Sequence, residues 1–194
     1  MNTKTLALSI IFTALTLAIN LAGPKIPAPY APFLIYQLWE IPIVFTFLAL
    51  GLLAGLITAG INTLILLVYF PGFLPFGPLY NLFAVLAMML GVFVPYLIST
   101  RGCKKENLST FLRHHIKIIT ISATALGIIF RVAVTSATNY FLLQQAPPVG
   151  LSYPTDAALA FLPLSILFNA TVALYTIPIA IAITVAVSSK IKIN

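Results

Sequence analysis

Long apolar runs, separated by short polar or proline-rich segments, recur along the whole chain. Each run approaches the ~20 residues that an α-helix needs to cross the hydrocarbon core of a bilayer. We predict an all-α, polytopic membrane protein that forms one domain over residues 1–194. Its six transmembrane helices are expected at about residues 5–22, 33–50, 52–70, 79–99, 116–142 and 160–188.

The breaks between the apolar runs are rich in proline and glycine. GPKIPAPYAP (23–32), PGFLPFGP (71–78) and QQAPPVGLSYPTD (144–156) are predicted to be irregular. GLLAG (51–55) contains small residues, which allow a sharp turn or a close helix approach between the second and third helices.

Composition agrees with a membrane protein. The 194 residues are 61% hydrophobic and only 7% charged, whereas a soluble domain carries about a quarter charged residues. The first helix is not expected to be a cleaved signal, because further apolar helices and no polar region follow it. The single cysteine, Cys103, excludes an internal disulfide and a cysteine-rich metal site.

The positions of the basic residues predict the orientation. With the N-terminus inside, eight Lys and Arg residues fall on the cytoplasmic side: Lys4, Arg101, Lys104, Lys105, Arg113, Lys117, Lys190 and Lys192. Only Lys25 lies in an outside loop, which follows the positive-inside rule. We therefore expect both termini in the cytoplasm of a cell-membrane protein. The net charge of +7 then reflects topology and lipid headgroups, not nucleic acid.

The three loops predicted outside are rich in proline, aromatic and amide residues and are nearly uncharged. Irregular backbone at the edge of a membrane is tolerated where it is buried in protein or lines a cavity. These loops predict a substrate pocket that opens toward the extracellular side.

A charged residue lies within the fifth predicted helix, in IIFRVAVTSATNYFLL (128–143). Arg131, Thr135 and Asn139 are spaced by four and share one helix face. Counted from Ile116 at ~1.5 Å per residue, Arg131 lies ~22 Å along the helix, in the outer part of the ~30 Å core. Two interpretations are open. Arg131 either extends to the outer headgroups or faces the interior, which is favoured because a lipid-facing polar stripe is costly.

Other polar residues also have two interpretations. Asn169 either joins two helices or contacts a ligand, and Asn81 either caps the fourth helix or contacts a ligand. Glu40 either pairs with Arg131 or lies at the membrane interface beside Trp39.

Aromatic residues gather at the predicted outer edge of the helices. They are Tyr30, Tyr36, Trp39, Tyr80 and Tyr140. An interfacial aromatic belt is one explanation for this set. Stacking of these rings on a flat ligand is the other.

No catalytic or metal-binding motif is present. HExxH, GxSxG and a glycine-rich phosphate loop are all missing from the sequence. His114 and His115 are adjacent and would point ~100° apart on a helix, so they are a poor metal pair. We expect neither an enzyme nor a metal protein, and transport could not be driven by ATP bound to this chain.

Five short motifs resemble those of one transporter family. They are PFLIYQLWEIP (32–42), GLLAG (51–55), GPLYN (77–81), TSATNYFLL (135–143) and LFNATVA (167–173). They resemble segments of substrate-binding S-components, taken in the same order. The first two resemble P-F-L-K-x-D-F-S-D-I-P and G-P-x-x-G, and the third matches a Gly and an Asn four residues apart. The last two resemble M-T-x-x-N-Y-F and F-N-x-x-K. The S-components belong to energy-coupling-factor (ECF) vitamin transporters, and the riboflavin-specific ones are the most similar.

The resemblance implies a six-helix subunit that captures a vitamin, with riboflavin as the first candidate ligand and no cofactor. It implies two kinds of partner, a transmembrane coupling subunit and a pair of ABC-type ATPases. The first helix would meet the coupling subunit through its small-residue pair, Ala14 and Ala18. Asn81, Asn139 and Asn169 fall on positions that line or support the family's ligand pocket.

The sequence departs from the family pattern at the sixth helix and in the first loop motif. Val172 replaces the family lysine, and Gln37 and Glu40 replace two aspartates. Our hypothesis is that Arg131 takes over the role of that lysine, against the ligand or against Glu40. The candidate ligand-binding residues are therefore Tyr36, Gln37, Trp39, Glu40, Tyr80, Asn81, Arg131, Asn139 and Asn169.

Two other functions stay open at this stage besides an S-component for another vitamin or small metabolite. An autonomous secondary transporter should show a buried acid for coupling or inverted repeats, and no repeat stands out in the sequence. A purely structural membrane subunit would not be stabilised by any small ligand.

Overall fold

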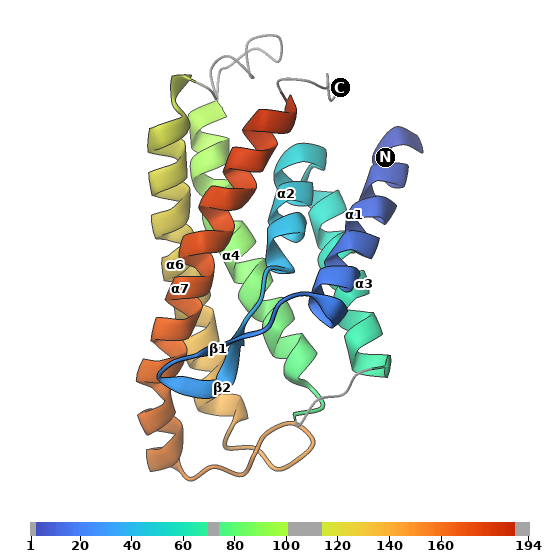
Figure 1. Cartoon of the computed structure of the whole chain (residues 1–194). Helices are drawn as coiled ribbons and strands as arrows, with labels where there is room; N and C mark the ends of the chain where they lie inside the picture. The colour runs from blue at the N-terminus through green and yellow to red at the C-terminus, as the bar shows by residue number, and fades with distance from the viewer. Residues whose placement is uncertain (1–2, 70–73, 101–113, 189–194) are drawn as a thin grey trace.

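The chain forms a bundle of helices joined on one side by a short hairpin (Figure 1). The computed structural model describes residues 3–69, 74–100 and 114–188. Its elements are α1 (Thr3–Ala22), β1 (Ile26–Ala28), β2 (Ala31–Tyr36), α2 (Glu40–Leu50), α3 (Leu52–Tyr69), α4 (Gly77–Thr100), α6 (Ile116–Leu142) and α7 (Thr155–Ser188).

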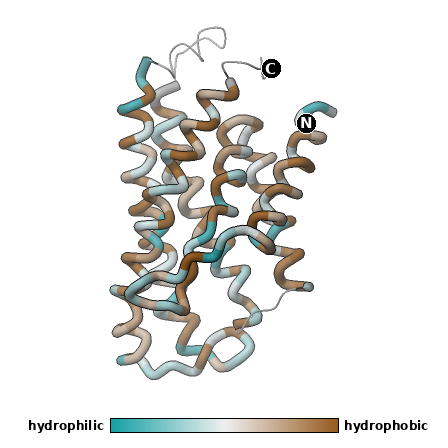
Figure 2. The backbone as a smooth tube through the Cα atoms, viewed as in Figure 1, coloured by the Kyte–Doolittle hydropathy of each residue, from teal (hydrophilic) through white to brown (hydrophobic). Residues whose placement is uncertain are grey.

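Five of the described helices are long and apolar enough to cross a membrane: α1, α3, α4, α6 and α7. Apolar residues cover much of their length, as Figure 2 shows, and large side chains such as Ile10, Val68 and Ile121 are exposed on them. A lipid environment explains this exposure, and the chain is a multi-pass membrane protein. The helix expected as a sixth span, α2, has 11 residues. At ~1.5 Å per residue it covers about half of a ~30 Å core.

The helix predicted over residues 33–50 begins only at Glu40, which corrects that prediction. Residues 31–36 are extended instead, and they pair antiparallel with β1, with Ile26 opposite Tyr36 and Ala28 opposite Ala31. A short apolar run does not distinguish a strand from a helix, and Pro32 disfavours helical backbone at the residue before it. Apart from this hairpin, which the sequence analysis missed, the all-α prediction is correct.

The other helix bounds follow the hydrophobic runs closely. The predicted range 116–142 is that of α6, and α1, α3 and α4 end within two residues of their predicted limits. In contrast, α7 begins at Thr155 and not at residue 160. Asp156 lies in its first turn, where a carboxylate interacts favourably with the helix dipole.

The turn between α2 and α3 depends on glycine. Gly51 ends α2 with a φ of 101°, a value that residues with a side chain rarely adopt. A Cβ atom on Gly55 would lie 2.6 Å from the Cβ of Phe47. The GLLAG segment therefore provides both the sharp turn and the close helix approach.

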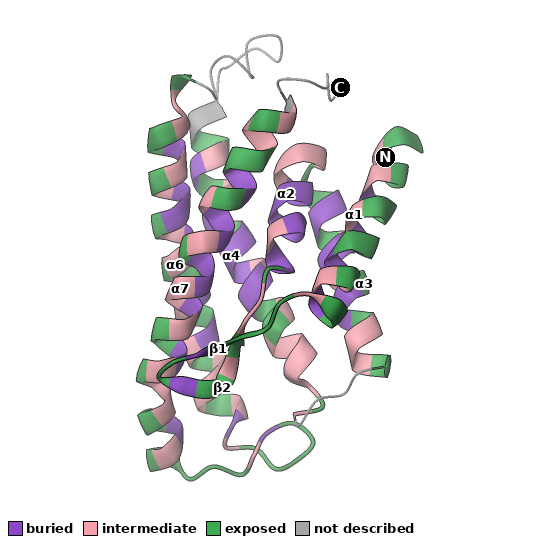
Figure 3. Ribbon diagram, viewed as in Figure 1, coloured by how far each residue is buried: buried purple, intermediate pink, exposed green. Residues whose placement is uncertain are grey.

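The centre of the bundle is α2, which is buried on nearly all sides (Figure 3). Ile43 and Val44 are fully buried there, and they belong to the same core cluster as Met88 of α4 and Ile177 of α7. A short central helix surrounded by longer ones therefore carries much of the core, and it brings Glu40 into the interior.

Polar residues join α1 to α3. The Thr13 hydroxyl donates to Thr58 Oγ1 over 3.2 Å, and Asn20 Nδ2 donates to Asn62 Oδ1 over 3.2 Å, with all four side chains buried. In hydrocarbon the alternative to such a bond is an unsatisfied polar group, so these bonds hold the two helices together.

Replacing Asn62 with Leu should lower the free energy of unfolding by about 0.6–1.7 kcal/mol, the range for interhelical hydrogen bonds in membranes. Asn20 would lose its partner, so thermal unfolding in detergent should occur at a lower temperature. The N20L/N62L double variant should recover most of the loss, because two apolar groups of similar shape replace both partners. A double variant less stable than N62L would contradict this account.

The described ends of the chain, at the start of α1 and the end of α7, lie at the same end of the bundle (Figure 1). The hairpin and the loop that precedes α7 lie toward the opposite end. Which end faces the cytoplasm stays a prediction. Several residues used for that prediction lie outside the described residues, namely Arg101, Cys103, Lys104, Lys105, Arg113, Lys190 and Lys192.

Candidate ligand-binding site

A cavity of about 640 Å³ lies at the end of the bundle away from the described chain ends. This volume is within the ~300–1,000 Å³ range of small-molecule sites. Residues of β2, α4, α6, α7 and the loops before α4 and α7 line it: Phe33, Leu34, Leu74, Gly77, Tyr80, Asn81, Ala84, Thr135, Thr138, Asn139, Leu143, Leu151, Tyr153, Phe161, Ser165, Phe168 and Asn169.

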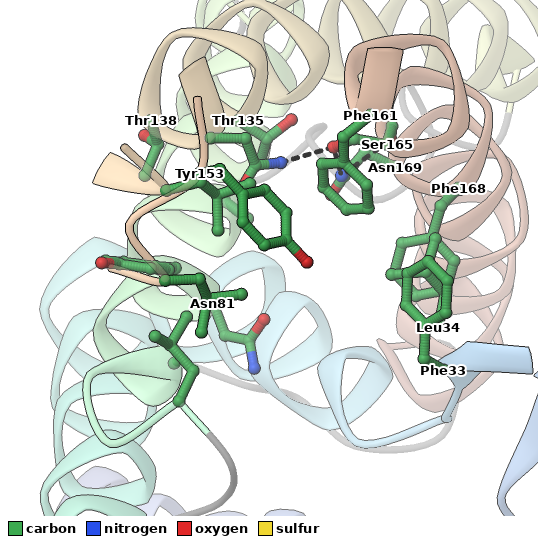
Figure 4. Close-up of a pocket in the computed structure, with 17 residues that line it drawn as sticks. Phe33, Leu34, Asn81, Thr135, Thr138, Tyr153, Phe161, Ser165, Phe168 and Asn169 are labelled. Atoms are coloured by element: carbon green, nitrogen blue, oxygen red, sulfur yellow. Dashed lines mark hydrogen bonds between the residues drawn. The ribbon is translucent and has the colours of Figure 1, made fainter. Parts of the chain in front are cut away.

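Aromatic rings form one part of the cavity wall (Figure 4). Phe33 of β2 lies against Phe161 of α7, with ring centroids 6.0 Å apart and planes inclined by 31°. Phe168 follows two turns later on α7, and Tyr153 enters from the loop before α7. The rings can contact the faces of a flat ligand. The Tyr80 hydroxyl donates to the carbonyl of Val149 and so ties α4 to that loop.

Three polar side chains form a connected group on another part of the wall. Asn139 Nδ2 of α6 donates to Ser165 Oγ of α7 over 2.5 Å. Asn169 Nδ2, one turn further on α7, donates to the Ser165 carbonyl oxygen over 2.9 Å and approaches Ser165 Oγ at 3.3 Å. Asn81 projects into the cavity from α4 (Figure 4). These amides and the hydroxyl can form hydrogen bonds with a ligand.

A buried ion pair lies directly behind this polar group. Arg131 is only 2% exposed, and its Nη1 and Nη2 atoms donate to the two carboxylate oxygens of Glu40, the Nη2 bond being 2.9 Å long. Arg131 Nε donates to Asn169 Oδ1 over 2.9 Å. The structure therefore places Arg131 in the bundle interior and pairs it with Glu40, and the alternative in which it extends to the headgroups is wrong.

The cavity itself is electrically neutral. Of the described residues that line it, none carries a charged side chain. The guanidinium and carboxylate of the Glu40–Arg131 pair neutralise each other, and Asn169 lies between this pair and the cavity. A ligand in the cavity would therefore contact uncharged amide and hydroxyl groups and aromatic rings.

Comparison with known proteins identifies the fold. No family model matches the chain, and no curated protein sequence matches it. A solved structure described as "Structure and mechanism of the S component of a bacterial ECF transporter" superposes with a TM-score of 0.70. The alignment covers 97% of this chain and 98% of that one, with 19% sequence identity. The chain has the fold of an ECF-transporter S component. At this identity the likeness establishes the fold alone.

The S-component fold brings four of the predicted residues into the cavity lining: Tyr80, Asn81, Asn139 and Asn169. Asn81 lies in the second turn of α4, which begins at Gly77, so it does not cap that helix. The position of Asn169 fits both of its predicted roles. It joins α7 to Arg131 of α6, and it also lines the cavity.

The other five predicted residues lie outside the cavity lining: Glu40 and Arg131 form the ion pair behind it, and Tyr36, Gln37 and Trp39 lie elsewhere. Trp39 is 7% exposed and packs in the core. Tyr36 stacks on Phe168, with ring centroids 4.9 Å apart, and the Gln37 carbonyl accepts a 2.6 Å hydrogen bond from the Tyr175 hydroxyl. Phe33 and Leu34 of β2 line the cavity, whereas Tyr36 and Gln37 lie beside Tyr175 of α7.

Sequence reasoning missed several residues that line the cavity, which are Phe33, Thr138, Tyr153, Phe161, Ser165 and Phe168. Ser165 could have been found, since it precedes Asn169 by four residues and shares its helix face. The phenylalanines offered no signal, because the chain contains 14 of them and apolar rings occur throughout its helices.

Proposed function

We propose that this protein is the substrate-binding subunit of an ECF-type importer and captures a neutral, flat, ring-containing vitamin. Riboflavin is the first candidate. The observation that carries this proposal is the character of the cavity, in which aromatic rings and uncharged amide and hydroxyl groups face the same space. The S-component fold supports the transport role.

Riboflavin suits this cavity chemically. The isoalloxazine system offers a large face for contact with aromatic side chains, and its imide edge has acceptors and a donor that pair with Asn-type amides. Thiamine carries a cation and biotin a carboxylate. Either charge would be left without a counterion in the cavity, because Glu40 and Arg131 already neutralise each other, and an unpaired buried charge is costly.

The proposed partners are a transmembrane coupling subunit and two ABC-type ATPases in the cell membrane. The sequence has no nucleotide-binding motif of its own, so in this proposal ATP is hydrolysed on another chain. Ala14 and Ala18 lie on an exposed face of α1, opposite the face that meets α3. Small residues on an exposed face allow close approach of another helix, which supports this face as the surface for the coupling subunit.

Riboflavin binding tests the proposal directly. Protein purified from cells grown in rich medium should be yellow, and it should quench riboflavin fluorescence on titration after the ligand is removed. Added riboflavin should also raise the unfolding temperature, since a ligand that binds only the folded state stabilises it. Colourless protein with no quenching and no thermal shift would reject riboflavin as the ligand.

Asn139→Ala should weaken riboflavin binding about 10- to 100-fold, because a hydrogen-bonding group that the ligand would cover is lost at a cost of ~1–3 kcal/mol. Fluorescence titration gives the dissociation constant. Gln145→Ala is the matched control, since Gln145 is an exposed amide near the same end that bonds the Phe141 carbonyl and does not line the cavity. Equal affinity of the N139A protein and the control would remove Asn139 from the site.

A further inference from the structure

Asn169 connects the buried ion pair to the cavity, and its orientation is determined by Arg131. A guanidinium has only N–H donors and no acceptor. Asn169 must therefore turn its Oδ1 atom toward Arg131 Nε, 2.9 Å away. Its Nδ2 atom then faces Ser165, where it donates to the backbone carbonyl and approaches Oγ.

The orientation of the Asn169 amide also determines how the Ser165 hydroxyl can bond. Ser165 Oγ receives N–H groups from both Asn139 and Asn169, so its two lone pairs are occupied and its own proton is left to be donated. Within the described parts of the chain, no acceptor for that proton is identified, although Ser165 is only 2% exposed and lines the cavity. Asn139 has used an N–H group on Ser165, which leaves its Oδ1 atom as an acceptor.

We propose that Arg131 is a positioning residue that determines the hydrogen-bonding polarity of the cavity wall. Through Asn169 it makes Ser165 a donor beside an acceptor on Asn139. An adjacent donor and acceptor match the adjacent carbonyl and N–H of a cyclic amide or imide. The inference rests on the proposed function and deepens it, because it names the ligand edge that the site selects.

Glu40 completes this arrangement. It holds both terminal nitrogens of Arg131 and balances the charge, which leaves only Nε to act on Asn169. Arg131 consequently takes the place of the family lysine as the partner of Glu40, and it does not contact the ligand. The site then has no net positive charge that would attract an anion.

The donor role of Ser165 can be measured with flavin analogues. In 2-thioriboflavin and 4-thioriboflavin one imide carbonyl becomes a thiocarbonyl, which is a weaker acceptor. For wild-type protein, one of the two analogues should bind about tenfold more weakly than riboflavin, the effect of weakening one buried hydrogen bond. We call the affinity for riboflavin divided by the affinity for the weaker analogue the thio ratio. A substitution with a purely structural effect would change the affinities for riboflavin and both analogues together and leave the thio ratio unchanged.

Two double variants change the polarity while keeping the buried charges balanced. E40Q/N169D keeps one carboxylate against Arg131, but the carboxylate introduced at position 169 accepts the Ser165 proton, so the tenfold ratio should fall to about one. E40Q/R131M removes the ion pair, so Asn169 loses its fixed orientation and the ratio should also fall. The control is T176V on α7, because Thr176 is buried and outside this network, and it should keep the wild-type ratio.

A measurement without ligand separates this inference from the proposed function. In protein labelled with ¹⁵N-asparagine, the Asn169 side-chain amide protons should exchange with water at least tenfold faster in E40Q/R131M than in wild type. An unchanged exchange rate, or an unchanged thio ratio in both double variants, would overturn the positioning role. Failure of every flavin to bind would reject riboflavin as the ligand, and the amide exchange would still decide the role of Arg131.

Discussion

Glu40→Gln should lower the free energy of unfolding by about 3–5 kcal/mol, the usual effect of breaking a buried ion pair from one side. Glu40 and Arg131 are 4% and 2% exposed. The substitution would leave the guanidinium charged and without a counterion in the interior. Thermal or denaturant unfolding in detergent measures the change, and the E40Q protein should unfold at a much lower temperature than wild type.

The E40Q/R131M double variant is the control for this prediction. This variant leaves no unpaired charge in the interior, and removing a whole buried ion pair costs much less than removing one partner, so the double variant should be clearly more stable than E40Q. Asp156→Asn removes an exposed acid from the first turn of α7, and its effect should be at most about 1 kcal/mol. If the E40Q and D156N proteins had the same free energy of unfolding, the Glu40–Arg131 pair would contribute no more to stability than an exposed charge does.

Gly91→Ala is expected to destabilise the protein by about 3 kcal/mol, at the upper end of the usual range for overpacking. A Cβ atom at position 91 of α4 would lie 2.6 Å from the Cα atom of Gly127 and 2.6 Å from the carbonyl oxygen of Leu126, both on α6. These are backbone atoms, so only a separation of the two helices would relieve the contact. Unfolding in detergent again gives the measurement.

Gly60→Ala is the matched control for this second prediction. Gly60 also lies within a helix, α3, but a Cβ atom there has nothing within 4 Å. Alanine is favoured over glycine in a helix by about 0.8–1 kcal/mol, so this variant should be slightly more stable than wild type. The change in the free energy of unfolding caused by Gly→Ala should therefore have opposite signs at positions 91 and 60. A G91A protein as stable as G60A would show that α4 and α6 do not approach each other this closely.

The helices and the turn between α2 and α3 could be predicted because their signals are local. The length of an apolar run indicates a membrane helix, and the bounds of α6 were correct on this basis. Gly51 marks a turn because few other residues adopt its φ of 101°. The strand at residues 31–36 could not be predicted in the same way. Its apolar run fits a helix as well as a strand, and only its pairing with β1 selects the strand.

The sequence by itself determined that this is a multi-helix membrane protein and that Arg131, Thr135 and Asn139 share a helix face. Only the tertiary structure decided what Arg131 meets, because Glu40 is 91 residues away along the chain and Asn169 is 38 residues away. Either interpretation of Arg131 fitted the spacing of its own helix. Packing of α4 and α7 against α6 excludes lipid from this position. A charge buried there needs the carboxylate of Glu40, at the start of α2, and the amide of Asn169 on α7.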